Sequence, residues 1–291
     1  MERSDRQALL SLPAVLVAAA ALGLAGSQGG VAVARAPVFA AAIGVAFLMQ
    51  WIAFVPAYLA KSERFFDLTG SMTYLVVTAL AVALSPPRDA RSFLLLGLVA
   101  VWGIRLGSFL FRRVRRSGKD ARFDKIKRSF PRFLQTWTLQ GLWVSFTLAA
   151  ALAAITASVR RPLGLVTWIG LAVWLVGFGI EAVADAQKSR FRSNPANRGR
   201  FIGSGLWAWS RHPNYFGEIV LWTGIALIAT PVLRGWQWVS WISPVFVALL
   251  LTRISGIPML EKRGDEKWGG QEGYEAYKRR TSILVPWPPR R

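Results

Sequence analysis

Residues 37–60 read PVFAAAIGVAFLMQWIAFVPAYLA and contain no charged side chain. About 20 consecutive apolar residues are long enough to cross a bilayer as a helix. Similar apolar runs recur along the chain, in which 53% of the 291 residues are hydrophobic and only 18% are charged. We predict eight membrane helices, at roughly 8–26, 37–60, 71–85, 92–111, 136–157, 163–184, 214–231 and 238–256. The expected fold class is therefore all-α, a polytopic integral membrane helix bundle of about eight transmembrane helices, with a range of seven to nine.

The basic residues are distributed unevenly around these runs. The net charge is +21, from 36 Lys and Arg residues against 15 Asp and Glu residues. If the N-terminus lies in the cytoplasm, most basic residues fall in cytoplasmic segments and are densest in 112–132 and 188–211. This asymmetry follows the positive-inside rule, and the same clusters attract anionic lipid headgroups. We expect membrane lipids as partners and no nucleic acid, because no nucleic-acid recognition motif accompanies the charge.

Residue counts exclude several kinds of chemistry. The chain has no cysteine, so thiolate nucleophiles, iron–sulfur clusters and zinc–thiolate sites are excluded. His212 is the only histidine, so a histidine-box di-iron centre or a three-histidine metal site cannot form. We therefore expect no metal. The absence of cysteine and the high Arg and Ala content favour a bacterial inner membrane over the endoplasmic reticulum.

The informative ionisable residues lie near the predicted cytoplasmic ends of two helices. Glu181 and Asp185 are four residues apart and share one helical face, and Asn214 and Glu218 repeat this spacing on the next helix. The intervening loop is rich in arginine, the residue that binds phosphate bidentately. Acids beside loop arginines suit a ligand with sugar hydroxyls and phosphates. Alternatively, the acids only pair with the arginines and close the helix ends.

Four motifs in this half of the chain resemble those of a known superfamily. They are Glu181-x3-Asp185-x-Gln-Lys188, Ser210-Arg-His-Pro-Asn-Tyr-Phe-Gly-Glu218, Ser255-Gly-Ile-Pro-Met-Leu-Glu261 and Gly273-Tyr-Glu-Ala-Tyr277. In this order they resemble the membrane steroid 5α-reductase superfamily, which includes sterol reductases and isoprenylcysteine carboxyl methyltransferases. The similarity is greatest to a bacterial branch of 3-oxo-5α-steroid 4-dehydrogenase-like proteins that is often left as a domain of unknown function. It divides the chain into N-terminal transmembrane helices, 1–60, and a reductase-like domain, 61–291, with a cofactor-binding half at about 180–291.

The resemblance implies NADPH as cofactor, in a pocket that faces the cytoplasm. We expect His212 to contact the cofactor or to have a structural role rather than to transfer a proton, because Pro213 follows it at a helix start. Position by position, the implied cofactor contacts are Glu181, Asp185, Arg192, Arg200, His212, Asn214, Tyr215, Glu218 and Arg253.

The substrate end departs from the superfamily pattern. Those reductases place a glutamate and a tyrosine against the substrate carbonyl, but the tyrosine position here corresponds to Trp102. We therefore expect Asp67 as the polar anchor, with Tyr74 second and Glu63 as a further candidate. The alternative for Asp67 is an acid that complements a helix N-terminal dipole. Two further departures are Ile257 and Glu261, where the reductases carry a histidine and a tyrosine.

The resulting hypothesis is NADPH-dependent reduction of a carbon–carbon double bond conjugated to a carbonyl, in a lipophilic small molecule such as a 3-oxo-Δ4-steroid. An S-adenosylmethionine-dependent methyltransferase of the isoprenylcysteine type is the main alternative. It has less use for the loop arginines, because S-adenosylmethionine carries no phosphate. A non-catalytic lipid-binding or scaffold protein that kept the fold is the third possibility.

Overall fold

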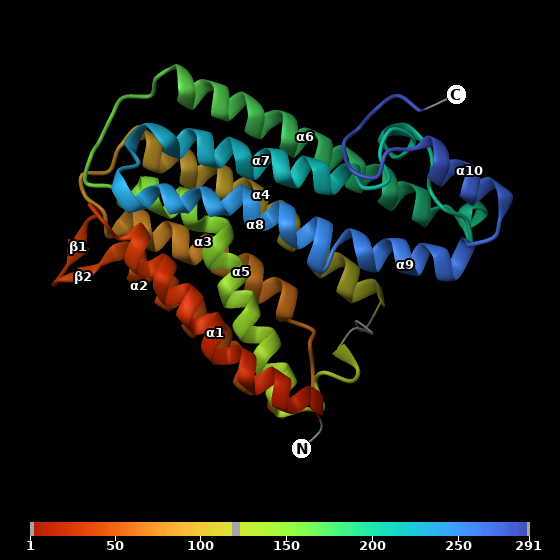
Figure 1. The fold of residues 1–291 in the computed structure, drawn as a ribbon, viewed down its shortest axis with the longest axis horizontal. Coiled ribbons are helices and arrows are strands. Elements are labelled where there is room, and N and C mark those ends of the chain that lie inside the picture. The colour runs from red at the N-terminus through yellow and green to blue at the C-terminus, as the bar shows by residue number, and fades with distance from the viewer. Residues whose placement is uncertain (1–2, 118–122, 290–291) are drawn as a thin grey trace. The chain divides into compact units, whose positions relative to one another are not determined.

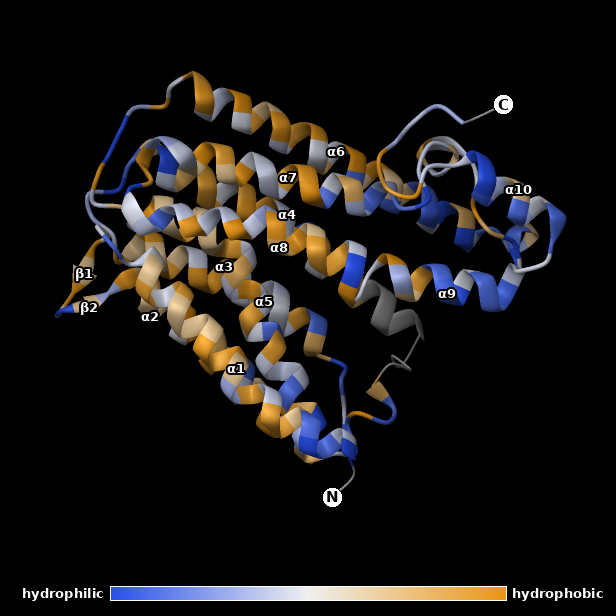
Figure 2. Cartoon of the chain, in the orientation of Figure 1, coloured by the Kyte–Doolittle hydropathy of each residue, from blue (hydrophilic) through white to orange (hydrophobic). Residues whose placement is uncertain are grey.

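The structure is a computed structural model that describes residues 3–117 and 123–289. Within these ranges, eight helical segments are long and apolar enough to cross a membrane. Each corresponds to one of the apolar runs in the sequence, so the prediction of a polytopic helical membrane protein is confirmed. Figure 2 shows hydrophobic residues along these segments and hydrophilic residues toward α9 (Ile257–Trp268) and α10 (Glu272–Arg280).

The chain divides into two compact units, described separately below. The first comprises residues 1–166 with 228–243, and the second comprises 167–227 with 244–291. In the first unit, five long helices are α1 (Arg3–Gly26), α2 (Val38–Leu59), α3 (Phe66–Ala83), α4 (Ala90–Ser117) and α5 (Phe130–Thr156). The sequence did not suggest the short antiparallel hairpin of β1 (Ala32–Val33) and β2 (Ala36–Pro37) that joins α1 to α2.

Helix α5 forms the core of the first unit. All side chains from Leu148 to Ile155 are essentially inaccessible to solvent. Alanine occupies most of this stretch, and its small side chain allows neighbouring helices to approach closely. Helices α1, α2 and α3 all contact α5, which therefore holds this unit together.

Several predicted helix boundaries were wrong, among them the start of α3 and the end of α4. Helix α3 begins at Phe66 rather than 71, so Asp67 lies in its first turn instead of before it. Helix α4 continues to Ser117, into the stretch 112–132 that was expected to be a loop. Hydropathy locates where an apolar run ends, whereas a helix can continue past that point with charged residues. Residues 118–122 of that stretch lie outside the described residues.

In the first unit, which includes residues 228–243 at the end of α7, arginines close the C-terminal ends of three helices. Arg88 donates to the carbonyls of Val82 and Ala83 in α3, and Arg160 donates to Ile155 of α5 at 3.0 Å. Arg91 donates to the carbonyl of Ile228 in the last turn of α7 (Pro213–Ala229). Cations are favourable there because unpaired carbonyls make a helix C-terminus negative.

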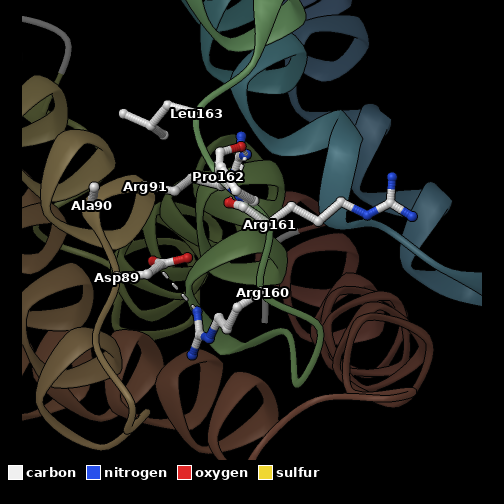
Figure 3. Close-up of a pocket in the computed structure, with 7 residues that line it drawn as sticks. All are labelled: Asp89, Ala90, Arg91, Arg160, Arg161, Pro162 and Leu163. Atoms are coloured by element: carbon white, nitrogen blue, oxygen red, sulfur yellow. Dashed lines mark hydrogen bonds and ion pairs between the residues drawn. The ribbon is translucent and has the colours of Figure 1, made fainter.

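These contacts explain a small pocket of about 260 Å³ beside Asp89, Arg91 and Arg160. Figure 3 shows Arg160 facing Asp89, while the side chain of Arg161 extends away from it. Arg91 and Arg160 already bind backbone carbonyls, and Arg160 also pairs with Asp89. The pocket is therefore part of the structure that closes these helix ends.

In the second unit, α6 (Leu165–Ser193) and α7 run side by side (Figure 1). Glycines make this contact possible. A Cβ atom on Gly224 would lie 2.6 Å from the backbone nitrogen of Trp174, and one on Gly217 would lie 2.6 Å from that of Glu181. After α7 the chain continues through α8 (Ile242–Leu249), a π-helical turn (Leu250–Ile254), α9 and α10.

Candidate functional site

The close contact of α6 and α7 determines where the polar residues of the second unit lie. Glu181 faces Gly217 across this contact, and its side chain is buried. One turn later on α6, Asp185 accepts a hydrogen bond from the Asn214 side-chain amide at 3.2 Å. The face of α6 that carries Glu181 and Asp185 therefore meets the face of α7 that carries Asn214 at one end of this helix pair.

The loop between α6 and α7 folds back onto α6. The Trp207 indole N–H donates to the carbonyl of Ala184 at 3.0 Å, and Gln187 accepts from the backbone N–H of Leu206 at 3.0 Å. The ammonium of Lys188 lies 4.2 Å from the centre of the Trp207 ring. This cation–π contact holds a positive charge one turn beyond Asp185.

Helix α10 supports the loop from the other side. The Tyr277 hydroxyl donates to the carbonyl of Trp207 at 2.7 Å, and burial raises the pKa of Tyr277 well above its usual value. The extended tail also pairs with the segment before α7. Arg211 donates its backbone N–H to Ser282, and the Ser210 hydroxyl donates to Leu284. The loop is thus ordered by contacts from three parts of the second unit.

His212, just before α7, belongs to a cluster in which Glu261 is the shared partner. Its Nε2 is 2.8 Å from Glu261 of α9, and the same carboxylate pairs with Arg211 at 2.6 Å. Burial lowers the pKa of His212, although its contact with Glu261 opposes this shift. In a neutral ring, a hydrogen bond to a carboxylate places the proton on Nε2. Nδ1 is then an acceptor, and it is buried with no hydrogen-bond partner among the described residues.

All nine predicted cofactor residues lie in the second unit, but they differ in exposure. Asp185 is bonded to Asn214, and the rings of His212 and Tyr215 are stacked 5.7 Å apart. Glu218 is half-buried on α7, one turn beyond Asn214. Glu181 is buried on α6. The other three are exposed cations, Arg192 at the end of α6, Arg200 in the loop and Arg253 in the π-helical turn.

The three substrate candidates lie in the first unit. Glu63 is buried and pairs with Lys127 at 2.7 Å. Tyr74 is also buried and packs edge-on against Trp102, with ring centres 5.0 Å apart. Asp67 is half-buried in the first turn of α3. Over residues 3–117 and 123–289, no group of three His, Asp or Glu side chains is placed to hold a metal ion.

The sequence did not indicate the pairing of Glu261 with Arg211 and His212. Glu261 was treated as a departure from the reductase pattern, and Arg211 as one of several loop arginines. His212 and Glu261 are 49 residues apart in the sequence. No local spacing connects them, so only the tertiary fold of the second unit reveals the cluster.

Comparison with known proteins gives one family match and several distant relatives. The model of a family described as "Protein of unknown function (DUF1295)" matches residues 53–281. An uncharacterised protein of Schizosaccharomyces pombe is 26% identical over 226 residues, which are 67% of this chain and 63% of the relative. Methanethiol S-methyltransferase of Mycobacterium tuberculosis is 28% identical over 151 residues, 47% of this chain and 55% of the relative.

A third relative is 3-oxo-5-alpha-steroid 4-dehydrogenase 1 of Bos taurus, which is 29% identical over 119 residues, 40% of each chain. In all three relatives, the match covers less than two thirds of the relative's own length. No solved structure matches the chain.

Proposed function

We propose that this chain, which belongs to the DUF1295 family of the steroid reductase-like membrane superfamily, is an NADPH-dependent reductase of a lipophilic enone. Family membership confirms the resemblance predicted from the 210–218 signature. The relatives support an enzyme of reductase-like ancestry. The cofactor, the reaction and a substrate such as a 3-oxo-Δ4-steroid are our inference.

The observation that carries the proposal is the Asp185–Asn214 pair beside a cation-rich loop. A carboxylate next to an amide offers both an acceptor and a donor, which suits ribose hydroxyls or a nicotinamide carboxamide. Lys188, Arg192 and Arg200 offer charge-assisted donors for phosphates, including a 2′-phosphate. The chemistry of these residues fits a phosphorylated dinucleotide.

We assign orientation and polarisation to the protein's own residues. Glu181, Asp185 and Glu218 would hold the sugar and amide groups, and Asn214 lies in the first turn of α7, where backbone N–H groups remain free for an anion. The bound cofactor would supply hydride to the β carbon of the enone.

At the substrate, Asp67, half-buried in the first turn of α3, is the first candidate to polarise the carbonyl, and Glu63, which pairs with Lys127, is a further one. In protonated form, Asp67 would donate a hydrogen bond to the developing enolate oxygen. A proton taken up at the α carbon completes the reduction. Tyr74 is the second candidate for this role.

A methyltransferase that uses S-adenosylmethionine is the second candidate function. The match to methanethiol S-methyltransferase favours it, and it covers more of this chain than the match to the steroid dehydrogenase. Glu181 and Asp185 could equally face a sulfonium cation. The arginines at 192 and 200 have no evident part in that reaction, because S-adenosylmethionine has no phosphate.

The two functions are separated by ligand-induced stabilisation of the detergent-purified protein. A ligand that binds only the folded state raises the melting temperature by mass action. We expect NADPH to stabilise the protein more than NADH, and we expect Arg192→Ala and Glu218→Gln each to reduce that shift.

Arg190→Ala is the matched control, because Arg190 is equally exposed on the same turn of α6 but two residues away, on another face. It should leave the NADPH shift unchanged. Stabilisation by S-adenosylmethionine with none from NADPH would reject the reductase and support the methyltransferase. Stabilisation by neither would point to a non-catalytic protein.

A further inference from the structure

A second pocket, of about 540 Å³, lies in the first unit at the start of α1 and α5. It is lined by Asp5, Lys125, Arg128, Ser129 and Arg132. Three of these side chains are cationic and one is anionic, so the lining carries a net positive charge. None of these five residues has a role in the proposed reductase site.

Asp5, the single acid in the pocket lining, binds two other lining residues. Asp5 accepts a hydrogen bond from the Ser129 hydroxyl at 2.6 Å and an ion pair from Arg132 at 3.1 Å. Ser129 also caps α5 by accepting from the backbone N–H of Arg132. Asp5 therefore ties α1 to the first turn of α5.

The other nearby acids are occupied by a different cation. Glu63 and Asp124 both pair with Lys127, at 2.7 and 3.6 Å. Lys125 and Arg128 are exposed, and neither has an ion-pair partner within the described part of the chain. Two unpaired cations thus line a concave surface at the N-terminus of a 27-residue helix, where backbone dipoles also favour an anion.

The surroundings of the pocket indicate what kind of anion it takes. Helices α1 and α5 are both candidate membrane spans, so their ends lie where lipid headgroups would be. Phe130, which directly follows Ser129, exposes 46% of its surface, and Leu10, five residues beyond Asp5 on α1, exposes 68%. Cations next to exposed apolar side chains match a phosphate that carries acyl chains.

We infer that this pocket binds the phosphate group of an anionic phospholipid. Lys125, Arg128 and Arg132 provide charge-assisted donors to the phosphate oxygens, and the apolar surfaces of α1 and α5 accommodate the acyl chains. The site is separate from the proposed reductase function, and either can fail without the other.

The test compares phosphatidylglycerol, phosphatidylcholine and inorganic phosphate added to the full-length protein in neutral detergent. Native mass spectrometry counts the bound lipids, and melting temperature measures stabilisation. We expect wild-type protein to retain phosphatidylglycerol in preference to phosphatidylcholine. In Lys125→Gln/Arg128→Gln, the affinity for phosphatidylglycerol should fall about 25-fold, since each basic residue near an anionic lipid contributes roughly fivefold.

The matched control is Lys262→Gln/Arg263→Gln, which removes the same two charges from an exposed face of α9. It should bind phosphatidylglycerol like wild type. If the wild type and both double variants retained phosphatidylglycerol equally, the proposed lipid site would be wrong. If inorganic phosphate raised the melting temperature of the wild-type protein as much as phosphatidylglycerol does, the ligand would be a soluble anion and the assignment to a lipid would be wrong. Unchanged melting temperatures of both variants without lipid would show that folding is intact.

Discussion

At the scale of single residues, the second unit depends on one carboxylate that serves two partners. Glu261 pairs with Arg211 and accepts from His212, and the three side chains are mostly buried. In Glu261→Gln the amide can still bond to His212, but the Arg211 guanidinium loses its counter-charge. Leaving a mostly buried charge unpaired costs roughly 1–3 kcal/mol. We expect the melting temperature to fall by several degrees in a thermal unfolding assay.

Glu266→Gln is the control for this prediction. Glu266 lies on the same helix and is exposed, and it has no ion-pair partner within residues 3–117 and 123–289. Its substitution should leave the melting temperature unchanged. If Glu261→Gln were as stable as Glu266→Gln, the cluster would make no net contribution to stability. Removing the carboxylate together with both partners would then be the next comparison.

At the scale of elements, backbone contact between α6 and α7 is what places Asp185 beside Asn214. We predict that Gly224→Ala pushes the two helices apart, because the added methyl would overlap the backbone of Trp174. Overpacking of this kind typically costs about 1–3 kcal/mol. The expected result is a lower melting temperature and a weaker NADPH shift, although Gly224 lies about two turns from the nearest proposed cofactor residue, Glu218.

Gly179→Ala provides the contrast within α6. A Cβ there would meet no atom within 4 Å, and alanine is favoured over glycine in a helix by about 1 kcal/mol. This variant should be as stable as wild type or slightly more so. A similar loss in both variants would mean that helix packing is not what makes Gly224 necessary.

Elements were also the level at which the sequence was most informative. Runs such as 37–60 identified each of the eight candidate spans found within the described residues, because about 20 consecutive apolar residues are long enough to cross a bilayer as a helix. The sequence could not show that α4 continues to Ser117 or that α3 begins at Phe66, since a helix can extend past its apolar run into polar and charged residues. It placed Asp185 and Asn214 on suitable faces, but the contact between those faces depends on glycines that pack across the two helices.

At the scale of the whole molecule, eight candidate spans are found within the described residues, and an even number of crossings would put residues 3 and 289 on the same side of the membrane. Three arginines at helix ends must be considered when the orientation of the chain in the membrane is predicted from its basic residues. Arg88, Arg91 and Arg160 lie in segments that the positive-inside rule assigns to the far side, and each is bound to helix-end carbonyls. Their charges are therefore explained by structure, and the orientation rests on the basic segments 112–132 and 188–211.

The orientation can be measured directly because the chain has no cysteine. Arg161 and Arg198 are both exposed and lie in loops on opposite sides of the predicted membrane. In intact bacterial spheroplasts, a membrane-impermeant maleimide should label Arg161→Cys at once and Arg198→Cys only after permeabilisation. The cysteine-free wild type controls for background. If Arg198→Cys reacted in intact cells and Arg161→Cys did not, the end of α6 with Arg192 and the following loop with Arg200 would face away from the cytoplasmic NADPH pool. The proposed reductase could then not work as described.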